Sequence, residues 1–195
     1  MMQDFSDIFP LCPSRSHEAL GAGAISFALC MIGMSKGPVL WVNERRQNER
    51  LHPGGLIQFC DPSRLMFAHG KSHMDVLWIA EEALRSKTVP LVIAQLSADI
   101  GLTEGRRLQL AAEAGRTTGL FLLPQDMGSN AAETRWHCMP IYDCSNSDST
   151  LFDWRCIKNK SGTTGRWIVN WNEATHHINL VPQDAQRTRP KAQAG

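Results

Sequence analysis

Residues 89–124 read VPLVIAQLSADIGLTEGRRLQLAAEAGRTTGLFLLP, and this stretch predicts the fold class. Residues 91–96 form a short apolar run with β-branched side chains, which is typical of a strand buried on both faces of a parallel sheet. Residues 120–123 repeat this pattern. Between the two runs, Thr103 is predicted to cap a helix that Gly115 ends. Strand, helix and strand in this order predict a right-handed βαβ unit in the middle of an α/β sheet.

The residues before this unit predict further strands and helices. We expect strands at residues 16–20, 39–42 and 65–68, and a helix at residues 25–34 that is apolar nearly all round and therefore buried. Another helix begins at Ser72, which forms a capping box with Asp75 in place of the usual Glu or Gln. The buried side of that helix is predicted to carry Met74, Leu77, Ala80 and Leu84.

The C-terminal part predicts an antiparallel hairpin. Residues 152–157 and 166–171 largely alternate apolar and polar side chains and flank a loop rich in turn residues, so we expect a hairpin at an exposed edge of the sheet. Trp167 lies on one face of the second strand, where it can pack on the core or anchor a partner. The predicted organisation is a loosely attached arm at residues 1–14, one domain at residues 15–180 and a disordered tail at residues 181–195.

Composition excludes several classes of protein. The 195 residues carry a net charge of +1, so no strong attraction to nucleic acid or to acidic membranes is expected. No apolar run is long enough for a membrane span, and the N-terminus lacks a signal-peptide pattern. The six cysteines show no CxxC pair or disulfide-framework spacing, which indicates free thiols in a reducing cytoplasm. We expect no metal site.

A small-residue loop follows the first predicted strand, where many α/β proteins bind phosphate. It consists of Gly21, Ala22, Gly23 and Ala24. A working phosphate loop needs a longer glycine-rich segment that ends in Lys and then Ser or Thr, and this chain has no lysine before Lys36. The favoured interpretation is that small residues allow a helix and a strand to pack closely.

Two polar residues end other predicted strands. Gln95 stands where nucleotide hydrolases of this class place the aspartate that orders Mg²⁺, and a neutral amide cannot supply that charge. Glu44 stands where a general base could activate water, but alone it has no metal or phosphate to act on. Gln95 is interpreted as a polar strand end and Glu44 as a solvated carboxylate. The sequence therefore predicts no catalytic residue, cofactor or metal.

Five stretches together resemble the ImuA family, which is RecA-like and belongs to a bacterial damage-induced mutagenesis cassette. They are SHEALG (16–21), GPVLWV (37–42), DVLWIAEEALRS (75–86), LTEGRRLQLAAEA (102–114) and AETRW (132–136). The resemblance covers roughly residues 15–172. It implies a RecA-like three-layer α/β core with a mostly parallel sheet and a C-terminal antiparallel hairpin.

The similarity to RecA itself is weaker but follows the same order along the chain. Glu44 falls on the catalytic glutamate of RecA, and residues 156–160 resemble a segment whose lysines contact nucleotide across a filament interface. The shortened loop without Lys-Thr and the replacement of the acid by Gln95 mean that ATPase activity is not carried over. Lys158 and Lys160 are predicted to contact a partner or DNA backbone, or else to be solvated lysines on an edge strand.

The family resemblance implies a function in the SOS response. It implies a non-catalytic accessory role in error-prone translesion DNA synthesis, with ImuB and a DnaE-type polymerase as partners, and it extends to modulation of RecA. DNA contact is expected to be indirect or weak. Residues 39–135 also resemble SulA, so a division inhibitor that binds FtsZ is one alternative, and a nucleotide-binding RecA-like ATPase is the other. SulA chains stop soon after the stretch that resembles ETR here, which favours ImuA.

Overall fold

The computed structural model describes residues 5–46, 51–124, 128–142 and 151–181, and it confirms the predicted α/β class. Its helices are α1 (Ala24–Met34), α2 (Pro53–Leu56), α3 (His73–Arg85) and α4 (Leu102–Gly115), with 3-10 turns η1 (Phe5–Asp7) and η2 (Pro62–Arg64). Its strands are β1 (Ser16–Leu20), β2 (Val39–Glu44), β3 (Leu65–Gly70), β4 (Leu91–Gln95), β5 (Thr118–Leu122), β6 (Thr134–Pro140), β7 (Leu151–Asn159), β8 (Gly165–Asn172) and β9 (His177–Leu180).

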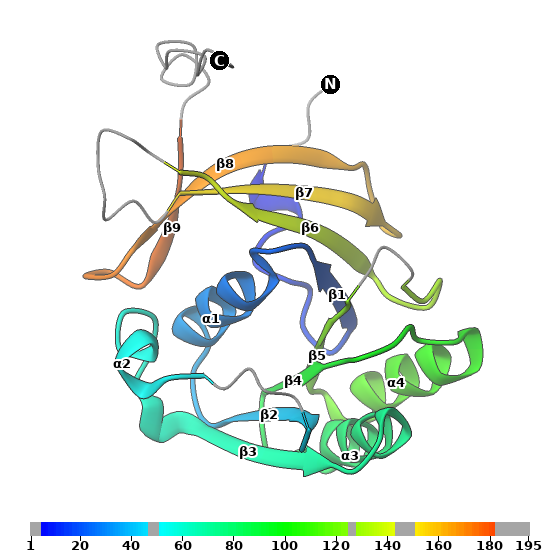
Figure 1. Cartoon of the computed structure of the whole chain (residues 1–195). Coiled ribbons are helices and arrows are strands. Elements are labelled where there is room, and N and C mark those ends of the chain that lie inside the picture. Colours follow the sequence, from blue (N-terminus) through cyan, green and yellow to red (C-terminus); the bar gives the residue numbers. More distant parts are fainter. Residues whose placement is uncertain (1–4, 47–50, 125–127, 143–150, 182–195) are drawn as a thin grey trace, which may run out of the picture.

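These strands form a single sheet in the order β3-β2-β4-β5-β1-β6-β7-β8-β9. Neighbours are parallel from β3 to β6 and antiparallel from β6 to β9. From β1 the chain moves toward β3, and from β3 it moves back through β4 and β5. Because crossovers are right-handed, the two directions place their helices on opposite faces. Accordingly, α1 packs on one face, while α3 and α4 lie side by side on the other (Figure 1).

The strand around Ile93 is central, as the apolar run predicts. Ile93 is fully buried and pairs with Trp41 of β2 and Leu120 of β5. Helix α3 begins as predicted, because the Ser72 hydroxyl accepts a hydrogen bond from the Asp75 amide at 3.3 Å.

Two local predictions about the helices are wrong. The N-cap of α4 is Gly101 and not Thr103, which lies inside the first turn. Met74 is 55% exposed, because the apolar stripe of α3 is centred on Val76, Leu77, Ala80 and Leu84 and leaves Met74 on its flank. Helix α4 ends at Gly115, as predicted, and the left-handed residue at the cap is Arg116.

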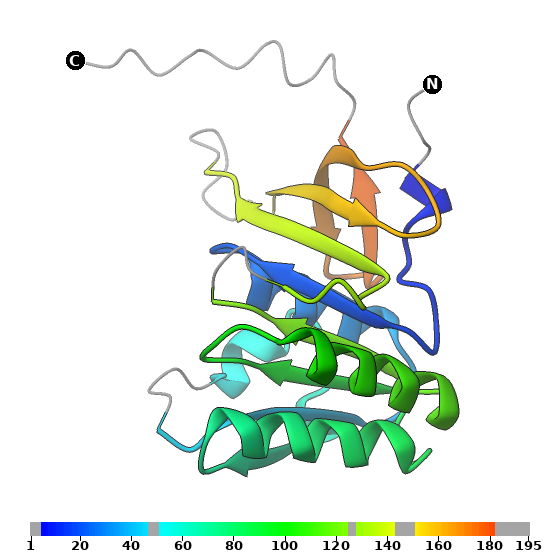
Figure 2. The ribbon, with the colours of Figure 1, turned by 90° about the vertical axis from the view of Figure 1, so that its right-hand side faces the viewer.

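The hairpin of β7 and β8 is confirmed, but it does not form the edge of the sheet. The short strand β9 pairs with β8 beyond it. The antiparallel strands curve over α1, so that one concave face of the sheet encloses this helix (Figures 1 and 2). Gly33 of α1 permits the strands to approach this helix closely, since a Cβ atom there would lie 2.6 Å from the ring of Trp171 in β8.

The prediction of a loosely attached N-terminal arm is wrong for residues 5–11. Phe5 and Phe9 are buried in the same core as α1 and the antiparallel strands. The ring of Phe9 lies 5.5 Å from that of Trp154, and the ring of Phe5 lies 5.4 Å from that of Trp167. Large aromatic side chains bury enough area to hold a segment whose regular structure is limited to one 3-10 turn. The predicted tail lies outside the described residues except Val181, whose amide donates to the Ile168 carbonyl.

Candidate functional site

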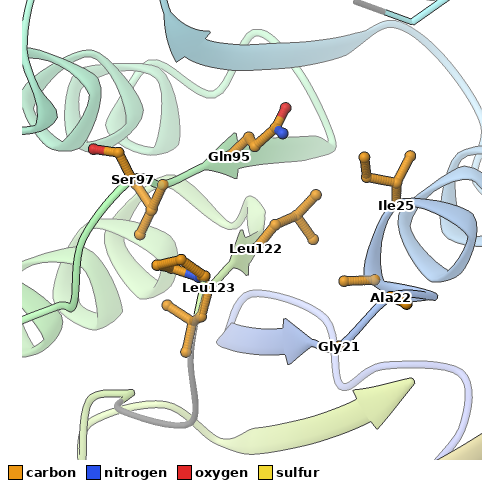
Figure 3. Close-up of a pocket in the computed structure, with 10 residues that line it drawn as sticks. Gly21, Ala22, Ile25, Gln95, Ser97, Leu122 and Leu123 are labelled. Carbon is orange, nitrogen blue, oxygen red and sulfur yellow. The ribbon is translucent and has the colours of Figure 1, made fainter. Parts of the chain in front are cut away.

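A pocket of about 710 Å³ opens at the carboxyl ends of the parallel strands (Figure 3). In open α/β sheets, ligands bind at this edge, at the point where the helices that follow neighbouring strands switch from one face of the sheet to the other. Here the switch occurs at β1, because α1 lies on one face and α3 and α4 lie on the other. The pocket is lined by Gly21, Ala22, Ala24, Ile25, Gln95, Leu96, Ser97, Leu122, Leu123 and Pro124. The structure therefore brings the predicted small-residue loop and the predicted strand end at Gln95 into one site.

The loop between β1 and α1 packs against the backbone of β6. The Gly23 amide donates to the Cys138 carbonyl at 2.8 Å, and the Ala24 amide donates to the Gly21 carbonyl at 3.0 Å. Gly21 has a φ of +90°, and a Cβ atom there would lie 2.5 Å from the Cys138 oxygen. Both amides are thus engaged within the protein, whereas a phosphate loop aims its amides at the ligand. This contact agrees with the interpretation that the loop serves close packing.

Glu44 and Gln95 end the neighbouring strands β2 and β4, as predicted from sequence. The Glu44 carboxylate accepts a hydrogen bond from the hydroxyl of Ser97, a lining residue of the pocket. No sequence pattern indicates this contact, because Ser97 lies 53 residues from Glu44 in a loop. The half-exposed Glu44 is therefore tethered, rather than simply solvated.

The described residues that line the pocket carry no charge suited to a nucleotide. Their side chains are apolar, apart from one amide and one hydroxyl, and none of them is ionisable. Phosphoryl transfer requires cations and a metal to stabilise the charge of the transition state. Among the described residues, no cluster of three or more His, Cys, Asp or Glu could hold a metal ion.

Lys158 and Lys160 hold a loop of the chain itself. The Lys158 ammonium donates to the carbonyls of Ser129 and Ala132 at 3.0 and 2.8 Å, and Lys160 donates to Ala131 at 2.5 Å. A β-bulge in the pairing of β6 with β7 brings Lys158 opposite Arg135. Neither alternative from the sequence foresaw this role. The prediction of a contact with a partner or DNA now has to compete with these internal hydrogen bonds.

A buried ion pair lies beside those lysines and was missed in the sequence. Glu18 of β1 accepts from Arg135 Nε at 2.7 Å and from the Ser129 amide at 2.7 Å. Burial raises the pKa of Glu18, although Arg135 opposes the shift. Burial likewise lowers the pKa of Lys158. The available signal was a charged residue inside the five-residue strand SHEAL, since a buried carboxylate needs a partner.

Trp167 is half-buried and faces the core, where it lies near Phe5 and Trp136. Of the two uses expected for this residue, the structure shows core packing.

Comparison with curated proteins finds Protein ImuA from two strains of Caulobacter vibrioides, NA1000 / CB15N and ATCC 19089 / CIP 103742 / CB 15. Each is 29% identical over 202 aligned positions, which cover 92% of this chain and 82% of the relative. No protein-family model matches the chain. The similarity spans most of both proteins and agrees with the motifs and fold described above, and it supports membership of this chain in the ImuA family.

Proposed function

We propose that the chain is a non-catalytic accessory protein of the bacterial DNA-damage response, and that it acts in error-prone translesion synthesis with ImuB and a DnaE-type polymerase. The observation that carries this proposal is the similarity to ImuA over 92% of the chain. The partners, the modulation of RecA and the location in the cytoplasm are part of the proposal. None of the described helices is both long and apolar enough to cross a lipid bilayer.

The absence of charge among the described lining residues of the pocket supports the non-catalytic part of the proposal. Purified protein with Mg²⁺ should give no ATP turnover above that of a buffer blank, because the described lining residues supply neither a cation nor a metal-ordering acid. The matched control is Glu44→Ala, which removes the only predicted general base. Steady turnover by the unaltered protein that is lost in Glu44→Ala would show that the second alternative, a RecA-like ATPase, is correct.

The extent of the similarity favours this role over that of a division inhibitor. An alignment over 92% of the chain must reach past residue 146, which is about three quarters of the length. It therefore includes part of the region from β7 onward, which known SulA chains lack according to the sequence comparison above. Trp154 and Trp171 from this region are buried in the core around α1.

A capture experiment separates the two candidates. Tagged full-length protein from damaged cells should retain ImuB and the DnaE-type polymerase, and its overproduction should leave cell division unaffected. Long undivided cells together with direct binding to FtsZ would overturn the ImuA-type role. Truncation after Asn146 is a poor test, since it removes buried tryptophans and should unfold the domain. Point variants on the surface should be used instead.

A further inference from the structure

A row of basic side chains crosses the outer face of the antiparallel strands. His137 of β6 lies directly opposite Arg155 of β7, and Arg155 lies directly opposite Arg166 of β8. Directly opposed residues share one face of a sheet, while the alternating neighbours Trp154 and Cys156 point into the core. The basic row, defined as His137, Arg155 and Arg166, is therefore on the face opposite α1. None of the described helices covers this face of β7 and β8 (Figure 1).

Asp153 organises the two arginines. It accepts from Nε and Nη2 of Arg166, both at 2.9 Å, and from Nη2 of Arg155 at 2.8 Å. Like charges directly opposite each other on a sheet repel, and one shared carboxylate relieves this repulsion. Burial works to raise the pKa of Asp153, but hydrogen bonds from the arginines outweigh it and the pKa is lowered. Asp153 is therefore ionised, and the trio keeps a net charge of +1.

The two guanidinium groups are accessible as well as ordered. The side chains of Arg155 and Arg166 are 46% and 59% exposed, while that of Asp153 is 8% exposed. Asp153 engages Nε and Nη2 of each arginine and leaves Nη1 of each unengaged by it. A guanidinium fork that is already fixed loses little further entropy on binding an oxyanion, and two such forks lie side by side here.

The remainder of this face indicates what kind of anion it suits. Ile157, the unpaired residue at the bulge in β7, is 40% exposed, and Met139 of β6 is half-buried on the same side. The aromatic rings of these strands pack instead on the α1 side. Single-stranded nucleic acid is bound largely by stacking of its bases on aromatic side chains. Arginines beside exposed aliphatic groups fit carboxylates next to aliphatic side chains.

We propose that the outer face of β6–β8 is an interaction surface for an acidic protein segment in which Asp or Glu alternates with aliphatic residues. Its carboxylates bind Arg155 and Arg166, and its aliphatic side chains contact Ile157. This surface is separate from the pocket at the carboxyl edge, and the proposal does not depend on the proposed function.

The test is fluorescence anisotropy with the full chain and a short labelled peptide in which Glu alternates with Leu. The unaltered protein should bind the peptide, more weakly at higher salt because the arginines are exposed. Arg155→Gln should weaken binding about tenfold, equivalent to about 1.4 kcal/mol. It should not lower the melting temperature, because Arg166 keeps its two-point contact with Asp153. Arg106→Gln, an exposed cation of α4, is the matched control and should bind like the unaltered protein.

Ile157→Ser is a second variant that changes no charge, and it should weaken peptide binding several-fold. Amide chemical-shift changes on titration should be confined to β6–β8. Absence of binding, or equal affinity for the Arg155→Gln and Arg106→Gln variants, would refute the proposal. Binding of oligodeoxythymidylate that depends on Arg155, without binding of the peptide, would assign the surface to nucleic acid and would equally overturn the proposal.

Discussion

Replacement of Gly115 by alanine tests the packing of α3 on α4. Gly115 is the last residue of α4, where the helix passes over the C-terminal turn of α3. A Cβ atom there would lie 2.7 Å from the carbonyl carbon of Leu84, closer still to its oxygen, and 3.1 Å from the Cα of Arg85. These are backbone atoms, so no side chain can rotate away. The two helices would have to separate by about 1 Å or more, because ordinary carbon contacts lie near 3.5–4 Å.

Two opposing effects decide the size of the change in stability. In an exposed helix, replacing glycine by alanine gains about 1 kcal/mol from helix propensity. Overpacking of a close contact costs about 1–3 kcal/mol and sometimes more. We expect the contact to dominate, because the clash is with backbone and both helices also pack on the sheet. The net loss should be about 1–2 kcal/mol, which lowers the melting temperature by roughly 2–8 °C in a chain of this size.

Thermal and urea unfolding followed by circular dichroism would measure the effect. The matched control is Gly55→Ala in α2, where a Cβ atom would meet nothing within 4 Å. The control should unfold at the same temperature as the unaltered protein, or slightly higher. If Gly115→Ala is as stable as Gly55→Ala, then α3 and α4 do not approach as closely as described, and the packing argument is refuted.

Three further predictions concern buried polar groups and the central strand. Burial lowers the pKa of His17 from 6.5 to about 4, although its hydrogen bond to the Cys12 carbonyl opposes this shift, so the unfolded chain takes up the proton first as the pH falls. The free energy of unfolding should therefore be at its full value above about pH 6.5 and should fall by at most about 3 kcal/mol toward pH 4. Urea unfolding at several pH values should show this fall in the unaltered protein and a smaller fall in His17→Gln. Lys158→Met removes two hydrogen bonds to carbonyls, so it should cost about 1–2 kcal/mol and speed hydrogen exchange in residues 128–132; unchanged exchange would show that Lys158 does not hold this loop. Ile93→Asp places a charge between β2 and β5 and should abolish soluble expression; a soluble variant with an unchanged melting temperature would contradict the central position of β4.

The candidate site was only partly predictable. Gly21 to Ala24, Glu44 and Gln95 all follow or end strands that the apolar runs reveal, so their gathering at one edge could be inferred from topology alone. The contact of Ser97 with Glu44 could not, since it joins two loops. The hydrogen bonds from Lys158 and Lys160 to the loop at residues 129–132 depend on the β-bulge between β6 and β7. No sequence pattern specifies that bulge.

The sequence by itself determined the α/β class, the central strand, the capped start of α3 and the hairpin of β7 and β8. Each of these rests on local periodicity or on a side chain that bonds to nearby backbone. Only the tertiary structure decided that residues 5–11 belong to the core, that β9 and not β8 forms the edge of the sheet, and that Asp153 binds two arginines on neighbouring strands. The physical reason is the distance along the sequence between the residues that interact. A local pattern indicates the secondary structure of one segment, whereas burial and charge pairing depend on residues that only the completed fold brings together.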